Sequence, residues 1–270
     1  MLRRGPTAIT LGGAALAAGA LLLSSGAAAQ YPAPGPAVPN PCVGEQAAVL
    51  LCPNLRMAKP SELYITKSRM RRGKILLHAT NNIMSRGEGP LEVRGKRLTR
   101  RKMSVRQVIH TTGGERRFFK TNARLVFYNI PGQGPYWKFR GAARFEIWSV
   151  RADGRRGEMI RKGPKLTYCF RDLVRTKASA RSPSRPVYPA CSQDRSKRFR
   201  TLGTSVGWSD IYPSTYYQNW INIRGLRGCF AFLHRADPAN HLYENKEGDN
   251  VGGRRIRLPP RNGKVRGCKR

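Results

Sequence analysis

Several common motifs are missing from this sequence, and each absence excludes one kind of site. There is no CxxC pair, so a zinc ribbon is not supported. A P-loop and an HExxH motif are also missing, which removes the nucleotide-phosphate and zinc-protease sites that those motifs build. No long amphipathic pattern stands out, so long helices are not expected.

Acidic residues are scarce as well, and the balance of charge is strongly positive. The 270 residues include 15 Asp and Glu against 51 Lys and Arg, which gives a formal net charge of +36. Such a surface attracts polyanions by counterion release, over roughly a Debye length of ~8–10 Å at ordinary salt. The basic residues are spread through the chain, with clusters in residues 69–74, 94–102, 151–165 and 195–200. The alternative explanation is a solvated surface in a host that favours arginine.

Residues 1–29 have the pattern of a signal peptide. Two arginines precede an apolar run over residues 9–23, and three alanines ending at Ala29 offer small side chains for cleavage. A transmembrane anchor is the alternative, but the run is short, rich in Ala and Gly, and lacks a basic stop. We therefore expect an exported protein, secreted or held in the cell envelope, without a transmembrane span in the mature chain. Its net charge would be +34 after the loss of Arg3 and Arg4 (36 − 2).

The mature chain is predicted to consist of a tether and one domain. Residues 30–41 are rich in proline and form an extended linker, and residues 42–270 form the domain. For an exported cationic protein, the nearest polyanions are envelope phosphate polymers, acidic polysaccharide and anionic lipid. Nucleic acid is not an expected partner, because no nucleic-acid-binding module motif occurs.

The cysteine count indicates disulfides. An even number of cysteines in an exported chain favours disulfides over metal thiolates. Proximity in sequence suggests three pairs, one at the N-terminal loop, one after a strand and one that ties down the C-terminal tail. The proposed pairs are Cys42–Cys52, Cys169–Cys191 and Cys229–Cys268.

Short apolar and alternating runs separated by turn residues predict an all-β, sandwich-like domain with long loops. Gly113 and Gly114 look like the tip of a hairpin between two strands. Residues 61–70 are interpreted as at best a turn. The expected strands of the body are residues 74–80, 91–94, 104–110, 124–129, 144–150 and 165–170.

Residues 203–250 are the most informative part of the chain. An aromatic turn at residues 207–213 precedes two alternating runs, 220–223 and 229–237, which we predict to pair as a β-hairpin. The order of individual residues is more specific, because it resembles the C-terminal signature of bacterial lysyl-oxidase-like domains. The matched residues are Gly203, Ser205, Gly207, Trp208, Asp210, Tyr212, Trp220, Ile221, Ile223, Gly225, Leu226, Gly228, His234, Asp237, Pro238, Asn240, Leu242, Glu244 and Asn250. The resemblance extends upstream to about Leu55.

This resemblance implies a particular chemistry. Lysyl oxidases oxidise primary amines with copper and a quinone, lysine tyrosylquinone, which they build from two of their own side chains. The stretch 163–172 (GPKLTYCFRD) resembles the strand that carries the cross-linking lysine, which places Lys165 at that position. Tyr212, in the sequence WSDIY, falls on the tyrosine that becomes the quinone.

The copper ligands are where this chain departs from the family pattern. The family places a His-x-His cluster at the positions that Tyr136 and Lys138 occupy here, while Trp137, Phe139 and Gly141 still match. A phenol and an ammonium are poor replacements for two imidazoles, and the ammonium adds positive charge where a cation would sit. The chain has four histidines, His78, His110, His234 and His241, and none is close to Tyr136 in sequence.

Two functions from different classes follow from these observations. The first is a catalytically degenerate lysyl-oxidase-like protein that serves as a cationic binding or structural module in the cell envelope, with no cofactor. The second is a copper-dependent amine oxidase with an unusual ligand set, which would act on small amines or on lysine side chains of proteins.

An acidic patch of Asp237, Glu244, Glu247 and Asp249 is interpreted as turn and cap residues, with a cation site such as one for calcium as the alternative.

Overall fold

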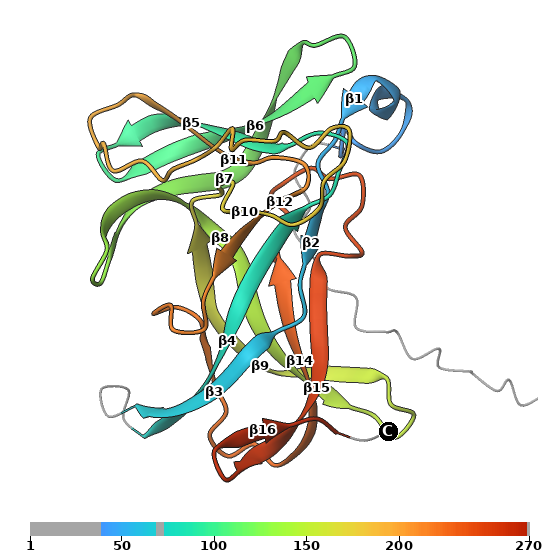
Figure 1. The fold of residues 1–270 in the computed structure, drawn as a ribbon, viewed down its shortest axis with the longest axis vertical. Helices are drawn as coiled ribbons and strands as arrows, with labels where there is room; N and C mark the ends of the chain where they lie inside the picture. Colours follow the sequence, from blue (N-terminus) through green and yellow to red (C-terminus); the bar gives the residue numbers. More distant parts are fainter. Residues whose placement is uncertain (1–38, 69–72, 269–270) are drawn as a thin grey trace, which may run out of the picture. The chain divides into compact units, whose positions relative to one another are not determined.

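The fold was analysed in a computed structural model, which describes residues 39–68 and 73–268. The signal peptide predicted for residues 1–29 and most of the linker at 30–41 lie outside the described residues. The described residues belong to one compact unit, Pro32–Arg270. They form two antiparallel sheets and a short 3-10 helix, η1 (Glu45–Val49), so the all-β prediction is confirmed (Figure 1). No helix in this part of the chain is long and apolar enough to cross a membrane.

The larger sheet is organised around its longest strand, β8 (Gly134–Val150). One edge of β8 pairs with β9, and the other edge pairs first with β7 and then with β14. Because β8 carries three partners, residues from distant parts of the chain meet along it. The other strands of this sheet are β1 (Leu50–Leu51), β5 (Leu91–Thr99), β6 (Lys102–Thr111), β7 (Arg116–Ile130), β9 (Arg156–Tyr168), β11 (Phe199–Thr204), β14 (Gly228–Ala236), β15 (Val251–Arg261) and β16 (Lys264–Arg266).

The smaller sheet is built on β4 (Lys74–Ser85), with which four strands pair. Along β4 buried and more exposed residues alternate, and Leu77, Ala79 and Ile83 point to the buried face. The remaining strands are β2 (Leu55–Met57), β3 (Ser61–Ser68), β10 (Val174–Arg175), β12 (Trp208–Tyr212) and β13 (Trp220–Asn222).

One large hydrophobic core takes side chains from both sheets. Leu77 and Ile83 of β4 belong to the same buried cluster as Trp137, Phe139 and Phe145 of β8. All five side chains are fully buried. Burial of each such side chain contributes about 1.5–3 kcal/mol to folding, so the contact between the sheets is a main source of stability.

The predicted C-terminal hairpin is wrong. Residues 220–223 and 229–237 do form strands, but β13 pairs with β4, whereas β14 pairs with β8 and β15. Alternation of side chains identifies a strand and its buried face, but it does not identify the partner. The expected aromatic turn is also mostly a strand, β12, which pairs with β4 and brings Tyr212 opposite Asn81.

A second correction concerns residues 61–70, where a turn at best was expected. Ser61–Ser68 form strand β3, which pairs with β4 across a register shift. None of its residues is fully buried, so the sequence has no clear apolar alternation there. The hairpin tip at Gly113 and Gly114 is confirmed, because these residues lie in the turn between β6 and β7 and Gly114 has a φ of 84°.

The three predicted disulfide pairs are present. Cys42–Cys52 closes the loop that contains η1, and Cys169–Cys191 ties the end of β9 to the loop before β11. Cys229–Cys268 joins β14 to the segment that follows β16. No cysteine in the described part of the chain is free, which is consistent with an oxidising compartment.

Candidate functional site

Tyr212, the predicted quinone precursor, lies in a cluster of aromatic rings between the two sheets. Its ring centroid is 4.1 Å from that of Tyr168 on β9 and 4.6 Å from that of Tyr216. The backbone N–H of Cys169 donates a hydrogen bond to the Tyr212 hydroxyl over 3.2 Å. Burial, and then the nearby Asp210, raise the pKa of Tyr212 well above its ordinary value, so this phenol stays protonated.

Lys165, the predicted cross-linking lysine, lies on β9. Its backbone is opposite Arg144 of β8 in the antiparallel ladder. Its side chain is outside what the structure describes, so the expected proximity of Lys165 to Tyr212 stays a prediction.

Tyr136 and Lys138, the predicted counterparts of the lysyl oxidase copper ligands, lie two residues apart on β8. Both line one pocket together with Tyr212 and Tyr216. Lys138 is only 2 % exposed, and its Nζ donates a hydrogen bond to the Tyr216 hydroxyl over 2.8 Å. The same Nζ is 4.6 Å from the ring centroid of Tyr212. Three of the four predicted site residues, Tyr136, Lys138 and Tyr212, therefore line one pocket. The amine that lies against the Tyr212 ring is that of Lys138.

Asp210 is a residue of this pocket region that the sequence analysis matched to the family but gave no role. It is 1 % exposed, and neither carboxylate oxygen has a hydrogen-bond partner among the described residues. The guanidinium of Arg171 lies near it, with Nε 3.9 Å from Oδ1. Asp210 is two residues from Tyr212 on β12, so the period of a strand could have placed both side chains on one face.

Burial shifts the pKa values of both Lys138 and Asp210. Loss of solvation lowers the pKa of Lys138 to about 7. The charge of Asp210 opposes this lowering, whereas the charge of Arg171 adds to it. Loss of solvation also raises the pKa of Asp210 to about 7, although Arg171 and Lys138 oppose that shift. Burial therefore favours the uncharged amine of Lys138 and the uncharged carboxyl group of Asp210.

We name this region the lysine–tyrosine pocket. It has a volume of about 520 Å³ and is partly open to solvent. Polar and aromatic side chains provide most of its lining, with Arg171 as its second cation. The lining residues are Ile130, Gln133, Tyr136, Lys138, Arg171, Ala190, Cys191, Ile211, Tyr212, Pro213 and Tyr216.

The lysine–tyrosine pocket does not fit copper. Copper in such enzymes is held by imidazoles, and no histidine lines the pocket. His78 stacks on Tyr64, His110 contacts Glu92, and His234 is buried against Phe145 with its ring centroid at 4.0 Å. Among the described residues, no group of three or more His, Cys, Asp or Glu side chains is arranged to hold a metal ion.

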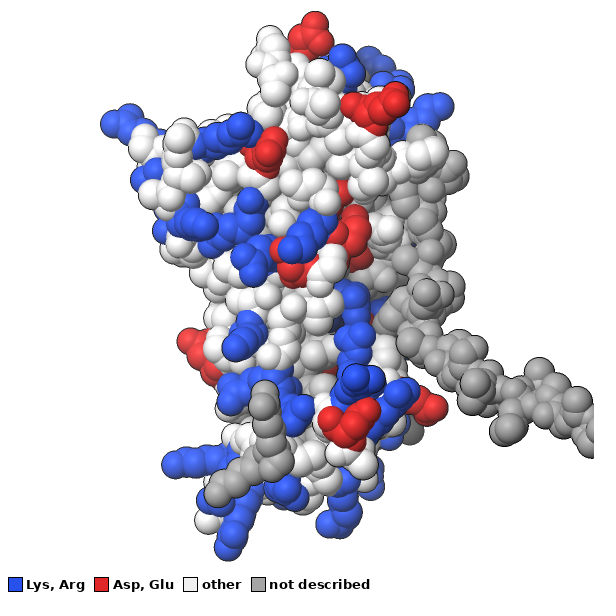
Figure 2. Space-filling view, turned by 90° about the vertical axis from the view of Figure 1, so that its right-hand side faces the viewer, with Lys and Arg blue, Asp and Glu red and all other residues white. Residues whose placement is uncertain are grey.

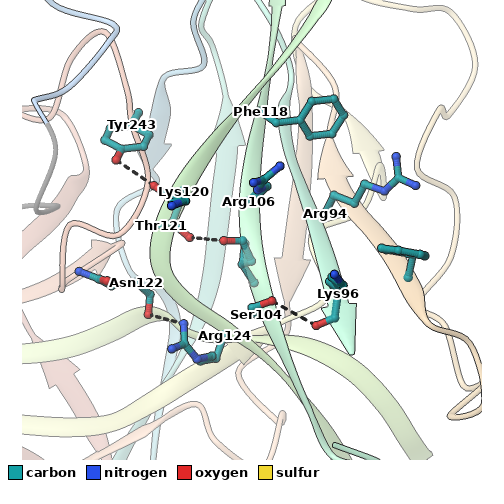
Figure 3. Close-up of a pocket in the computed structure, with 12 residues that line it drawn as sticks. Arg94, Lys96, Ser104, Arg106, Phe118, Lys120, Thr121, Asn122, Arg124 and Tyr243 are labelled. Atoms are coloured by element: carbon teal, nitrogen blue, oxygen red, sulfur yellow. Dashed lines mark hydrogen bonds between the residues drawn. The ribbon is translucent and has the colours of Figure 1, made fainter. Parts of the chain in front are cut away.

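A second candidate site is a cationic groove on strands β5, β6 and β7. Basic side chains occur along the whole height of the face in Figure 2, with acidic ones in a few places. In the groove, residues that alternate along neighbouring strands bring their side chains together, and Arg94 lies opposite Arg106 while Arg106 lies opposite Lys120. The groove has a volume of about 800 Å³ and is lined by Arg94, Lys96, Ser104, Val105, Arg106, Phe118, Lys120, Thr121, Asn122, Arg124, Phe199 and Tyr243 (Figure 3).

Two aromatic rings of the groove are open to solvent. Phe118 is 42 % and Phe199 is 44 % exposed, although both side chains are apolar. The guanidinium of Arg94 lies 5.1 Å from the ring centroid of Phe199 and 6.0 Å from that of Phe118. Figure 3 shows Arg94 and Phe118 at the same end of the groove. Exposed apolar rings beside cations are typical of a binding surface.

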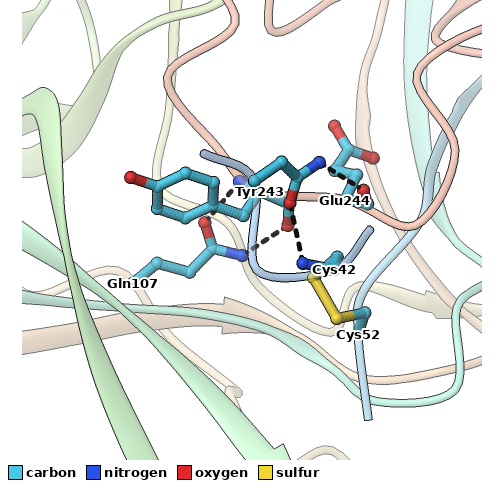
Figure 4. Close-up of a disulfide and its surroundings, with 6 residues drawn as sticks. Cys42, Cys52, Gln107, Tyr243 and Glu244 are labelled. Carbon is cyan, nitrogen blue, oxygen red and sulfur yellow. Dashed lines mark hydrogen bonds between the residues drawn. A yellow bond between two sulfur atoms is a disulfide. The ribbon is translucent and has the colours of Figure 1, made fainter. Parts of the chain in front are cut away.

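One end of the groove is anchored by a second, smaller core. Tyr243 donates a hydrogen bond from its hydroxyl to the backbone carbonyl of Lys120 over 2.9 Å. Its backbone exchanges two hydrogen bonds with the side-chain amide of Gln107, and it packs with the Cys42–Cys52 disulfide (Figure 4). The disulfide therefore supports the position of β7 beside the groove.

The acidic patch supports the loop before β2. The buried Glu244 accepts hydrogen bonds from the backbone N–H of Leu55 and from Asn250, and Asp237 accepts one from the backbone N–H of Leu242. Glu247 also accepts a hydrogen bond from Asn250. These contacts are those of turn and cap residues, as the sequence analysis interpreted them.

Comparisons with known proteins name no family for this chain. No protein-family model matches it, and no curated protein matches it. Function must therefore be argued from the two sites.

Proposed function

We propose that this protein is an exported cationic binding module that holds an anionic, sugar-containing polymer of the cell envelope in the groove on β5, β6 and β7. Its scaffold, in this proposal, is a lysyl-oxidase-like β-sandwich domain in which Tyr136 and Lys138 replace the copper histidines. The protein would then have kept the architecture of the family without its oxidation chemistry.

The observation that carries the proposal is the composition of the groove. Its lining includes five cations and no carboxylate. Cations within one Debye length of each other create a continuous positive potential, because no acidic neighbour cancels it. A linear polyanion that lies along the strands could pair with several of these cations at once and release its counterions.

The exposed rings favour a polymer that contains sugars. Phe118 and Phe199 offer flat apolar faces, which a polyphosphate chain cannot use but the C–H face of a pyranose ring can cover. Arg94 lies between the two rings and could pair with a carboxylate or phosphate of the same sugar unit. Three disulfides suit such a role outside the cytoplasm.

The test compares groove variants with a charge-matched control. Arg94→Gln/Lys96→Gln should weaken binding to hyaluronan, a polymer of uronic acid and amino sugar, by about tenfold or more. Arg257→Gln/Arg266→Gln removes the same charge from two exposed, paired positions on β15 and β16 and should leave binding nearly unchanged. Equal loss in both double variants would mean that net charge alone drives binding, and would contradict the proposal.

Two further probes separate the possible polyanions. Phe118→Ala/Phe199→Ala should weaken binding to hyaluronan but not to inorganic polyphosphate, because only the sugar uses the rings. Vesicles of phosphatidylglycerol should bind less tightly than hyaluronan. Tighter binding to the vesicles, with no effect of the two phenylalanines, would assign the surface to anionic lipid instead.

A copper-dependent amine oxidase is the second candidate, and one observation favours it. An amine lies against the ring of Tyr212, as the formation of a lysine-derived quinone requires, although this amine belongs to Lys138. The candidate is weaker, because the pocket offers copper no imidazole.

A further inference from the structure

The groove does not use Lys138, and this lysine has unusual surroundings. Its Nζ lies among the rings of Tyr212 and Tyr216, at 4.6 and 5.0 Å from their centroids, and it lines a pocket that opens to solvent. A buried lysine of purely structural use would end on a paired carboxylate. Among the described residues, the amine instead donates its one hydrogen bond to the Tyr216 hydroxyl, over 2.8 Å. The nearby carboxyl group of Asp210 has no hydrogen-bond partner among the described residues.

We propose that Lys138 is a nucleophilic amine and that the lysine–tyrosine pocket takes small oxo acids, which it binds covalently as imines. Three features carry this proposal: a pocket of about 520 Å³, an amine on its wall, and a second cation, Arg171, on the same wall. The carbonyl carbon would meet Nζ, and the carboxylate of the oxo acid would pair with the guanidinium of Arg171.

The groups that face Lys138 come from several elements. Asp210 and Tyr212 lie on β12, Tyr216 lies in the loop that follows it, and Arg171 follows β9. Burial and Arg171 favour the uncharged amine, whereas Asp210 favours the ammonium. Tyr212 and Tyr216 stay protonated, because burial raises the pKa of both phenols. The lowered pKa gives Lys138 a much larger uncharged fraction near neutral pH than an ordinary lysine has, so the amine has a lone pair available for attack.

Imine formation balances with these groups alone. The Nζ lone pair attacks the carbonyl carbon, so that a C–N bond forms as the π bond of the carbonyl breaks, and one proton passes from Nζ to the carbonyl oxygen to give a carbinolamine. Asp210, in its uncharged form, supplies the proton with which the hydroxyl group leaves as water. The products are a protonated imine on Lys138, the carboxylate of Asp210 and one water molecule, so no oxidant or cofactor is needed.

The tyrosines contribute to selection. The Tyr216 hydroxyl holds Nζ through its hydrogen bond, and the rings of Tyr212 and Tyr216 present apolar faces to the carbon skeleton of the bound acid. The protonated imine would lie against these two rings, which favour a cation. The rings of Tyr212 and Tyr216, which keep water away from the free amine, would therefore also stabilise the protonated imine.

Reductive trapping tests the proposal on the unchanged protein. Incubation with pyruvate and cyanoborohydride at pH 7 should convert one imine to a stable secondary amine, and peptide mapping should place it on Lys138. The exposed Lys264 of the same protein is the internal comparison. Because an ordinary lysine of pKa about 10.4 is uncharged in only ~1 of 2,500 molecules at pH 7, Lys138 should react up to ~10³-fold faster at equal access. Modification spread evenly over surface lysines, with no enrichment at Lys138, would overturn the proposal.

Variants separate the roles of the two cations. Lys138→Arg should abolish the specific adduct while it keeps a cation at this position. Arg171→Gln should lower the preference for pyruvate over acetone, because acetone has no carboxylate to pair with the guanidinium. An unchanged preference would refute the assignment of Arg171, and a specific adduct that persists in Lys138→Arg would refute the assignment of Lys138.

Discussion

The buried pair of Lys138 and Asp210 should make stability depend on pH in an unusual way. The perturbation is the double variant Lys138→Met/Asp210→Asn, which keeps the volume of both side chains and removes both charges. In the native protein the pair is poorly satisfied, since Asp210 has no hydrogen-bond partner among the described residues and Arg171 is 3.9 Å away. Replacement of such a pair by uncharged side chains of similar size is often stabilising.

The direction of each pKa shift gives the sign of the effect. The pKa of Asp210 rises from 3.8 to about 7 on folding, so its contribution to stability is complete below pH 3.8 and falls as the pH rises to 7. The pKa of Lys138 falls from 10.5 to about 7, so its contribution is lowest below pH 7 and rises as the pH increases towards 10.5. Together they give a minimum of stability near pH 7. The upper limit of the effect is about 5 kcal/mol on either side, at about 1.4 kcal/mol per pH unit.

The assay is urea unfolding of the native protein and the double variant at pH 4.5, 7 and 9.5. The difference in unfolding free energy should favour the variant most at pH 7 and should shrink by up to about 3 kcal/mol at the two other pH values. The pKa values of Asp237 and Glu247 are also raised to about 7, but they affect both proteins alike and cancel in the difference. A difference that does not change with pH would refute the reasoning.

Three further predictions address the groove, the fold and the chemistry. The affinity for a flexible polyanion should fall on the order of 100-fold between about 50 and 200 mM salt, because about five cations at a slope of roughly −0.7 each give a slope of about −3.5; an affinity that barely changes would exclude counterion release. Cys42→Ser/Cys52→Ser should lower stability by about 3 kcal/mol for the 10-residue separation, measured by thermal unfolding, and should weaken groove binding through Tyr243; unchanged stability would contradict the anchoring role. The purified protein loaded with copper should show no quinone absorbance and no peroxide from primary amines, and a carbonyl reagent should leave Tyr212 unlabelled; a quinone at Tyr212 would restore the oxidase hypothesis.

Local patterns in the sequence predicted most strands, whereas their partners depend on contacts that no local pattern contains. The alternation at residues 220–223 and 229–237 located two strands correctly, but proximity in sequence suggested that they pair with each other. Instead β13 uses the free edge of β4, and β14 fills the edge of β8 beyond β7. Proximity succeeded for the disulfides, because each cysteine is bridged to its neighbour in chain order, at separations of 10, 22 and 39 residues.

The two sites differ in how far the sequence could lead to them. Tyr136, Lys138 and Tyr212 were singled out by their resemblance to the lysyl oxidase pattern, but the proposal for the amine depends on the burial of Lys138 near Asp210, which no sequence pattern indicates. The groove was not found at all. Its five cations come from three strands and look like scattered charges in a chain that has 51 Lys and Arg.

The two sites also depend on one strand. The first residues of β8 pair with β7, which forms one wall of the groove, and the same stretch carries Tyr136 and Lys138 into the lysine–tyrosine pocket. β7 contacts β8 through the pairs Tyr128–Tyr136 and Val126–Lys138, so a displacement of β7, which carries two of the groove's cations, would be felt on the neighbouring strand that carries the amine. Because Lys138 lies within contact of Tyr212 on the other sheet, its surroundings also depend on how the two sheets pack. A polymer bound in the groove and a small acid bound in the pocket would therefore contact the two paired strands β7 and β8, which is the physical route by which either could change the affinity for the other.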